Sequence, residues 1–142
     1  MTMPQEIELA SQQFGQLLDE LKQRALLETQ NQCYAMLRAV LHEFRDHLTT
    51  AQAIAFADGL PPIVCAIFVG HWQPGEGSAA STSGGNLHDA VVRRLTPHHF
   101  PPDSIVEDVF ALLAPRLDSA RSTAVIAALP PGLKELFADG KK

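Results

Sequence analysis

The fold is decided by residues 49–70, which read TTAQAIAFADGLPPIVCAIFVG, and within them by the tripeptide Leu60-Pro61-Pro62. The residue before a proline is pushed out of the helical region, so Leu60 is expected to be extended. Prolines suit the first turn of a helix, where the amide hydrogens that they lack have no partner within the helix. The tripeptide therefore predicts that one helix ends, the chain turns a corner and the next helix begins, with Leu60 in the core between them.

The helix before this corner has both a start signal and a stop signal. Thr49 and Gln52 have the spacing of a capping box, in which each side chain bonds the backbone amide of the other residue. Gly59 follows the Ala-rich segment and is expected to end the helix in the left-handed conformation. The pattern predicts a short helix that ends near Asp58 and a second short helix over 63–69.

The same tripeptide returns at Leu129-Pro130-Pro131, which is 69 positions later (129 − 60). At this offset residues 17–70 lie over residues 86–139 without a gap, and 11 of the 54 pairs are identical. Positions that differ keep an apolar residue where burial is expected and vary freely elsewhere, as two copies of one packing unit should. Apolar pairs of this kind include Leu37/Val106, Leu41/Phe110, Phe44/Leu113, Val64/Leu133 and Ile67/Leu136.

The repeat and the helical spacing of apolar residues together predict the fold class. We expect one all-α domain over residues 1–142, made of about eight helices in two pseudo-symmetric repeats, 17–70 and 86–139. Residues 73–85 are rich in Gly and Ser and predict a flexible linker between the repeats.

Further helices are expected outside the corners. Apolar residues spaced i, i+3, i+4 and i+7 predict an amphipathic helix over 5–28 and a central core helix over about 31–47. In the second repeat, the core helix is expected to have Asp103 in its first turn and to end or kink near Pro115.

Composition limits the class of partner. The chain has 142 residues, of which 46% are hydrophobic and 19% are charged, as is ordinary for one globular domain. The net charge is −5 and the basic residues are scattered, which argues against nucleic acid or an anionic membrane surface as a partner. No apolar run approaches about 18 residues, so no membrane span is expected.

The sequence also predicts a cellular compartment. The opening residues, MTMPQEIELA, lack the basic and apolar regions of a secretion signal. Cys33 and Cys65 fall on apolar helical faces and are expected to be reduced thiols rather than a disulfide. A cytoplasmic location follows from both observations.

Histidines and nearby acids provide the candidates for chemistry. His42 and His47 are five positions apart, so they cannot form the zinc-protease helix, whose histidines are four apart. His42 with Asp46, and Glu43 with His47, could each supply two metal ligands, or they could be ordinary charge pairs on an exposed helix face.

Three further histidines lie in predicted loops. His71 follows the first repeat, and His98 and His99 are adjacent in the second. They could form a three-histidine site if the repeats pack face to face, or they could simply be solvated. The metal candidates are therefore His42, Asp46, His71, His98 and His99, and the favoured hypothesis is that the protein has no metal, no cofactor and no catalytic residue.

The segments YAMLRAVLHEFRDHL (34–48), DGLPPIVCAIF (58–68) and GHWQP (70–74) resemble the bacterial family called domain of unknown function 2267. The resemblance covers about residues 14–139 and implies tandem helical repeats with no assigned activity. The matching motifs are Ala39-Val40-Leu41, Leu60-Pro61, Gly70-His71-Trp72, Arg116-Leu117 and Leu129-Pro130. Gly59 and Ala128 stand where the family usually has glutamine, and His47 stands where it usually has arginine.

These observations favour a soluble, non-enzymatic helical module that binds a protein partner or a second copy of itself. The alternative is a small metal- or ligand-binding enzyme that uses the loop histidines. A deep pocket in which two or more of the candidate residues converge would favour the enzyme, whereas an exposed apolar patch would favour the interaction module.

Overall fold

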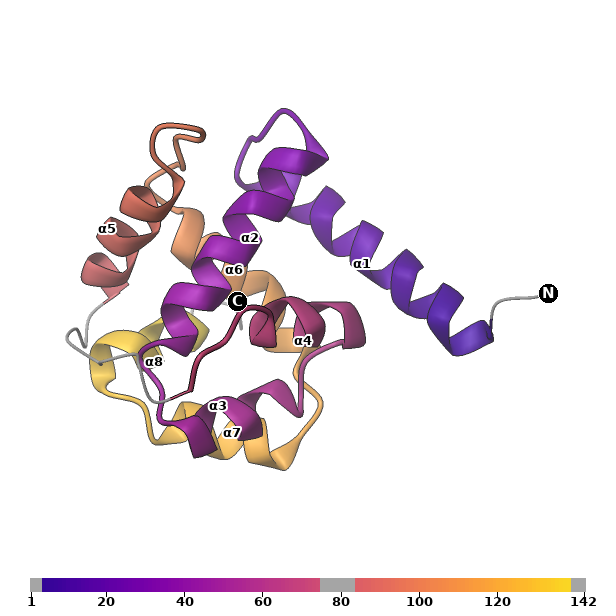
Figure 1. Cartoon of the computed structure of the whole chain (residues 1–142), viewed down its shortest axis with the longest axis vertical. Helices are drawn as coiled ribbons and strands as arrows, with labels where there is room; N and C mark the ends of the chain where they lie inside the picture. The colour runs from indigo at the N-terminus through magenta and orange to yellow at the C-terminus, as the bar shows by residue number, and fades with distance from the viewer. Residues whose placement is uncertain (1–3, 75–83, 139–142) are drawn as a thin grey trace.

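The computed structural model describes residues 4–74 and 84–138, and every regular element among them is helical (Figure 1). The all-α fold class predicted from the sequence is confirmed. The elements are α1 (Gln5–Arg24), α2 (Gln30–Arg45), α3 (Thr50–Ala57), α4 (Pro62–Val69), α5 (Gly84–Leu95), α6 (Ile105–Leu113), the 3-10 turn η1 (Ala114–Arg116), α7 (Ala120–Ala127) and α8 (Pro131–Ala138).

Local sequence explains most of the helix ends. Thr49 accepts a hydrogen bond from the amide of Gln52, and the Gln52 side chain accepts one from the amide of Thr49, which confirms the predicted capping box. Pro61 is the N-cap of α4 and Pro62 is its first residue, as the corner predicts. Leu60 is buried between the two helices. Pro115 lies in η1, directly after the end of α6.

Three expected details are wrong. Gly59 is not left-handed, because α3 ends through a tight turn in which the amides of Gly59 and Leu60 donate to Phe56 O and Ala57 O. The first helix ends at Arg24 rather than at residue 28, and Leu26 has a left-handed φ of 56° just beyond it. Asp103 lies in a turn before α6 rather than within its first turn.

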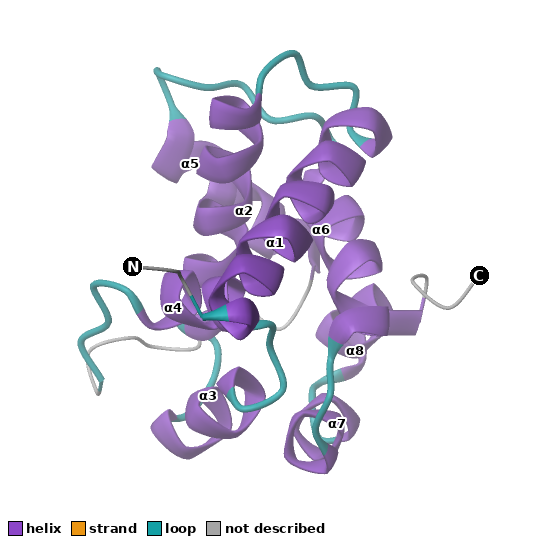
Figure 2. Cartoon of the chain, turned by 90° about the vertical axis from the view of Figure 1, so that its right-hand side faces the viewer, coloured by secondary structure: helices purple, strands orange, loops and turns teal. Residues whose placement is uncertain are grey.

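The longer helices form the body of the molecule. α2 packs against α1, α5 and α6, and α1 and α5 also pack against α6. The short helices α3 and α7 lie side by side at one end of this body, as Figure 2 shows, while α4 packs on α1 and α2 and α8 packs on α6. The N-terminal part of α1 extends away from the other helices (Figure 1).

Phenylalanine rings fill the centre of the core. Their ring centroids are 4.8–6.0 Å apart, in tilted or edge-to-face arrangements that aromatic pairs prefer. Because the rings come from five different helices, one cluster holds both halves of the chain together. Its members are Phe44, Phe56, Phe68, Phe110 and Phe137.

The two predicted repeats show matching helix bounds at the corners. Pro62–Val69 and Pro131–Ala138 begin and end 69 positions apart, which is the offset that the sequence gives. The two-repeat organisation itself stays a prediction. Most of the predicted linker, 73–85, lies outside the described residues. Helix α5 begins at Gly84, which is inside the range predicted for the linker.

The corner of the first half contacts the start of α7. Ser122 is buried and donates its hydroxyl to Phe56 O at 2.8 Å, and the amide of Asp118 donates to Gly59 O at 2.9 Å. A Cβ added to Gly59 would overlap Ser122 Oγ and lie 2.8 Å from Ser122 Cβ. Gly59 is therefore required for close approach of α3 and α7, rather than for an unusual backbone angle.

Replacing Gly59 with alanine is expected to lower the free energy of unfolding by about 1–3 kcal/mol, because α7 must move to make room. Gly15→Ala is the matched control: a Cβ there meets nothing within 4 Å, and alanine in the middle of α1 should stabilise the protein by about 0.5–1 kcal/mol. Urea unfolding of both variants measures the two effects. A Gly59→Ala protein as stable as the parent would show that α3 and α7 do not depend on this contact.

Candidate functional site

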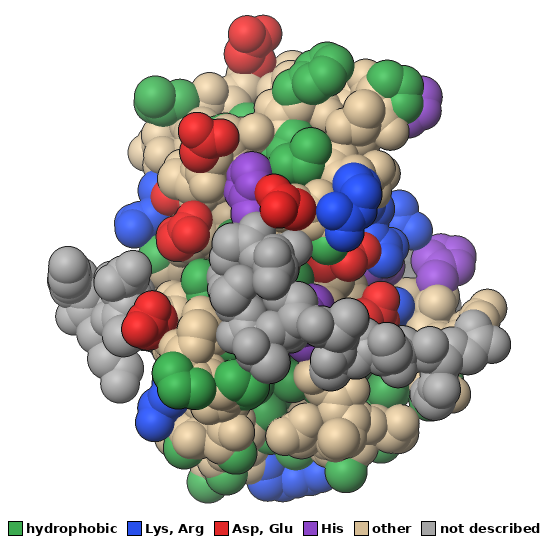
Figure 3. All heavy atoms as spheres, turned by 90° about the vertical axis from the view of Figure 1, so that its left-hand side faces the viewer, with side chains coloured by type: hydrophobic (Ala, Val, Ile, Leu, Met, Phe, Trp, Pro, Cys, Tyr) green, Lys and Arg blue, Asp and Glu red, His purple; other side chains and the backbone are tan. Residues whose placement is uncertain are grey.

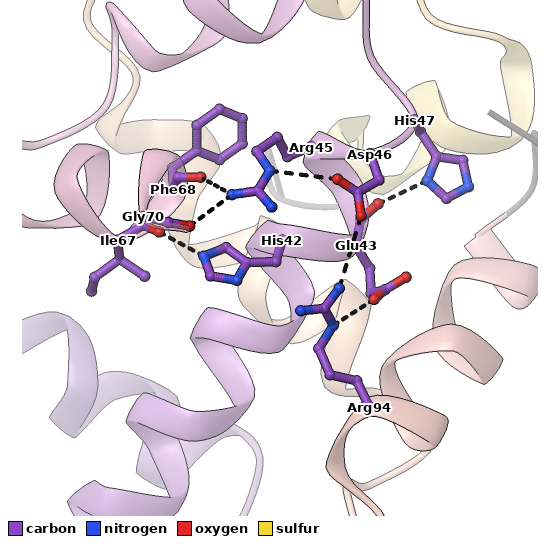
Figure 4. Close-up of polar contacts among 9 residues, drawn as sticks. All are labelled: His42, Glu43, Arg45, Asp46, His47, Ile67, Phe68, Gly70 and Arg94. Atoms are coloured by element: carbon purple, nitrogen blue, oxygen red, sulfur yellow. Dashed lines mark hydrogen bonds and ion pairs between the residues drawn. The ribbon is translucent and has the colours of Figure 1, made fainter. Parts of the chain in front are cut away.

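Polar side chains on the buried face of α2 meet the C-terminal end of α4 (Figure 4). His42 Nε2 donates to Ile67 O at 2.7 Å, and Arg45 Nη1 donates to Phe68 O and to Gly70 O, both at 3.0 Å. The last carbonyls of a helix have no partner within the helix and carry partial negative charge. Arg45 and His42 therefore cap α4 from a neighbouring helix, since α4 has no capping side chain of its own there.

The structure gives His42 and Asp46, the first pair of candidate metal ligands, different partners. His42 is only 2% exposed, so the alternative that placed it on an exposed helix face is wrong. Asp46 is half-buried, and its carboxylate lies 3.5 Å from Arg45 Nε and 3.8 Å from Arg94 Nη2. His47 points its Nδ1 at Glu43 O, 2.8 Å away. Each of these side chains therefore bonds or pairs with another group of the protein, and they do not point at one common position where a metal ion could bind.

The environment of His42 favours its neutral form. Burial lowers the pKa of His42, and the positive charges of Arg45, Arg94 and Arg38 lower this pKa further, although the bond to Ile67 O acts in the opposite direction. Because Nε2 donates to a carbonyl, the proton of the neutral ring lies on Nε2, and Nδ1 is left as an acceptor.

A hollow of about 310 Å³ lies where α2 meets the end of α5 and the loop that follows α5. We call it the α2–α5 hollow. It brings together three of the five candidate residues, two from the loop and one from α2, whereas Asp46 and His71 do not line it. The ionisable side chains that line it are Arg38, His42, Arg94, His98 and His99.

The shared hollow does not make a metal site. Among the residues that the structure describes, no group of three or more His, Cys, Asp or Glu side chains could hold a metal ion. His71 is exposed, with a left-handed φ of 57°, and follows the end of α4. The three-histidine site that would join His71 to His98 and His99 is therefore not formed.

A second and larger hollow was not foreseen from the sequence. It measures about 470 Å³ and lies between α1 and the Leu-Pro-Pro corner, with Arg116 and Asp118 at its edge. We call it the α1 groove. Its lining is mixed: the polar members are Gln13, Gln16, Asp58, Arg116 and Asp118, and the apolar ones are Ala10, Phe14, Leu17, Leu60, Pro61, Pro62, Ile63 and Val64.

One sequence signal could have revealed this groove. Ile7, Ala10, Phe14 and Leu17 lie on one face of α1, but the body of the protein buries only part of this stripe. Ile7 is 50% exposed, although it continues the apolar face. A stripe that extends beyond its intramolecular partner indicates a surface that another molecule can cover.

Two carboxylates and one guanidinium line the α1 groove, and Asp58 is paired with Arg121, whose Nη1 lies 3.9 Å from Asp58 Oδ1. The carboxylates are those of Asp58 and Asp118, and the guanidinium of Arg116 is engaged by an ion pair with Glu20 and by a bond from its Nη1 to Leu112 O. Asp58 accepts a hydrogen bond from Ser119 at 2.8 Å. On another face of the molecule, acidic and basic side chains are interspersed (Figure 3), as is typical of a solvated surface.

Comparison with known protein families matches residues 14–136 to the family described as "Uncharacterized conserved protein (DUF2267)". The chain belongs to this family. The matched residues include the polar contacts at the end of α4, both Leu-Pro-Pro corners and the residues of the α2–α5 hollow. No curated protein matches the chain. No helix in the described part of this DUF2267 member is long and apolar enough to cross a bilayer.

Replacing Arg45 with methionine is expected to lower the free energy of unfolding by about 2–4 kcal/mol, because Phe68 O and Gly70 O lose a charged donor in a buried place. Arg93→Met is the control, since Arg93 is exposed on α5, and its effect should stay within about 0.5 kcal/mol. Urea unfolding with circular dichroism measures both. Equal stabilities of the two variants would contradict the capping role of Arg45.

His42 is expected to make stability depend on pH. Its pKa is lower in the folded protein than in the unfolded chain, where it is about 6.5, so its contribution is complete above that value and is lost as the pH falls. The urea midpoint should therefore decrease between about pH 7.5 and pH 5.5. His42→Gln keeps an amide donor for Ile67 O and should flatten this slope.

Proposed function

We propose that this DUF2267 member is a non-enzymatic protein-interaction module and that its α1 groove receives an amphipathic helix with basic flanks. The observation that carries the proposal is the groove, whose lining includes apolar side chains of α1 and of the Leu-Pro-Pro corner. The N-terminal part of α1, beside it, extends beyond the body of the protein (Figure 1). A cytoplasmic location and the organisation into two repeats and one domain are parts of the same proposal.

The apolar part of the groove suits helix binding. Ala10, Phe14 and Leu17 line it along α1, and Pro61 and Val64 line it on the side of the corner, although Ala10, Leu17 and Val64 are largely buried in the protein itself. Ile7 lies beyond this lining, on the same face of α1, and is 50% exposed. A second helix could lay residues spaced i, i+3, i+4 and i+7 along such a surface, the usual geometry of helix-in-groove recognition. The volume of about 470 Å³ falls within the range of binding clefts.

The charged part of the groove selects the chemistry of the partner. Asp58 and Asp118 line it, and Glu6 and Glu8 lie at the extended end of α1. Arg116 is paired with Glu20, and Asp58 is paired with Arg121 at 3.9 Å, so Asp118 is the lining acid that remains for a partner. Lysine or arginine flanks on the partner would complement this potential and speed association. A second copy of the chain is less suitable, because the protein carries a net charge of −5 and the same acids would face each other.

A labelled peptide of roughly 18 residues, with leucines at helical spacing and lysines on both flanks, is expected to bind the full chain at least about tenfold more tightly than the same peptide with glutamate flanks. Fluorescence anisotropy measures both affinities. Ile7→Ser should weaken binding about tenfold through lost apolar burial, and Asp118→Lys should reduce the preference for lysine flanks.

Ile54→Ser is the matched control for this experiment. Ile54 is 49% exposed, like Ile7, but it lies on α3, whereas Ile7 lies on α1, about one turn before Ala10, the first residue that lines the groove. Equal weakening by Ile7→Ser and Ile54→Ser would overturn the proposed docking site. Light scattering of the same samples tests self-association: a dimer that Ile7→Ser converts to a monomer would make a second copy, rather than a basic helix, the occupant of the groove.

A further inference from the structure

We propose that the α2–α5 hollow binds a small phosphorylated molecule through its phosphate group. This site shares no residue with the α1 groove, so it does not depend on the proposed interaction function. Its lining, its charge and its position between fixed helices each support the assignment.

The hollow exists because α2 presents small side chains to the end of α5. Ala35 and Ala39 are one helical turn apart on α2 and both line it, so the space beside them is left open. Arg38 and His42 flank the alanines on the same helix, and His98 and His99 close the other side. A volume of about 310 Å³ is at the lower end of the range for small-molecule sites.

The lining is rich in basic side chains, although Arg94 is paired with two carboxylates. No acidic side chain lines the hollow among the described residues, whereas two arginines and three histidines do. The nearest acids, Glu43 and Asp46, are held by Arg94: Glu43 Oε2 lies 2.5 Å from Arg94 Nε, and Asp46 Oδ2 lies 3.8 Å from Arg94 Nη2 (Figure 4). These ion pairs fix the guanidinium of Arg94, so that its position does not have to be ordered when a ligand binds.

Arg38 supplies the cation that the protein itself does not neutralise. It is exposed on α2, and no hydrogen bond or ion pair joins it to another residue in the described parts of the chain. Planar guanidinium groups bind phosphate oxygens through two parallel hydrogen bonds, which makes a free arginine beside a fixed one a suitable phosphate clamp.

His42 adds a feature that distinguishes a phosphate monoester from a simple carboxylate. Its Nε2 donates to Ile67 O, so the neutral ring offers the lone pair of Nδ1 as an acceptor. A monoprotonated phosphate has both anionic oxygens for the arginines and a hydroxyl hydrogen for such an acceptor.

The test is a titration of the full chain with phenyl phosphate and, separately, with inorganic phosphate, followed by two-dimensional NMR of the backbone amides. Shifts are expected around Arg38, Ala39 and Leu95 and at His98 and His99, with saturation below about 10 mM. Arg38→Ala should weaken binding about tenfold, because a charged donor is lost at an exposed place where the fold is not at risk. Arg93→Ala changes an exposed arginine on α5 that does not line the hollow and should leave binding unchanged.

The two ligands distinguish the possible sources of the phosphate group. Tighter binding of phenyl phosphate supports a phosphorylated small molecule, whereas equal binding supports the same site with free phosphate as its ligand. The assignment is overturned if neither ligand saturates, if Arg38→Ala and Arg93→Ala weaken binding equally, or if the shifted residues lie elsewhere. Stoichiometric zinc binding that is lost in His98→Ala would also overturn it, in favour of a metal.

Discussion

Phe44 on α2 is the residue on which the rest of the arrangement depends. Its ring packs at 5.1 Å from Phe56 of α3 and at 4.9 Å from Phe110 of α6, so it joins helices from both halves of the chain. A completely buried aromatic side chain fixes the rotation of its helix about the helix axis, because the core around it is close-packed. With that rotation fixed, His42 and Arg45 are aimed at the end of α4.

The short helices need such support from outside. α3, α4, α7 and α8 have eight residues each, which is too short for a helix to be stable alone in water. α4 gains its stability from Phe68 in the phenylalanine cluster and from the donors of α2 at its C-terminal end. The contact between Gly59 and Ser122 stabilises α3 and α7 in a similar way, because it lets these two short helices pack against each other. The fold is thus a set of short helices held around a few long ones.

The two hollows differ in the chemistry that they offer. The α1 groove combines apolar side chains with amide and carboxylate groups, which suits a large partner that buries apolar side chains between polar flanks. The α2–α5 hollow is small and is lined by Arg38 and by Arg94, which Glu43 and Asp46 hold in place, and this suits a compact anion held by charged hydrogen bonds. Because α2 belongs to the hollow and α1 packs directly on α2, the two surfaces are built on neighbouring helices of one body.

The sequence by itself determined the helical class, the capping box at Thr49 and the corner at Leu60-Pro61-Pro62, because these depend on backbone rules within a few residues. It also showed the family through motifs of packing residues. Only the tertiary structure decided that His42 is buried against Ile67 O, that Gly59 makes room for Ser122, and that α1 extends past its partners to form a groove. Each of these joins residues far apart in the chain. Apolar periodicity predicts which face of a helix is buried, but it does not predict which other segment covers that face.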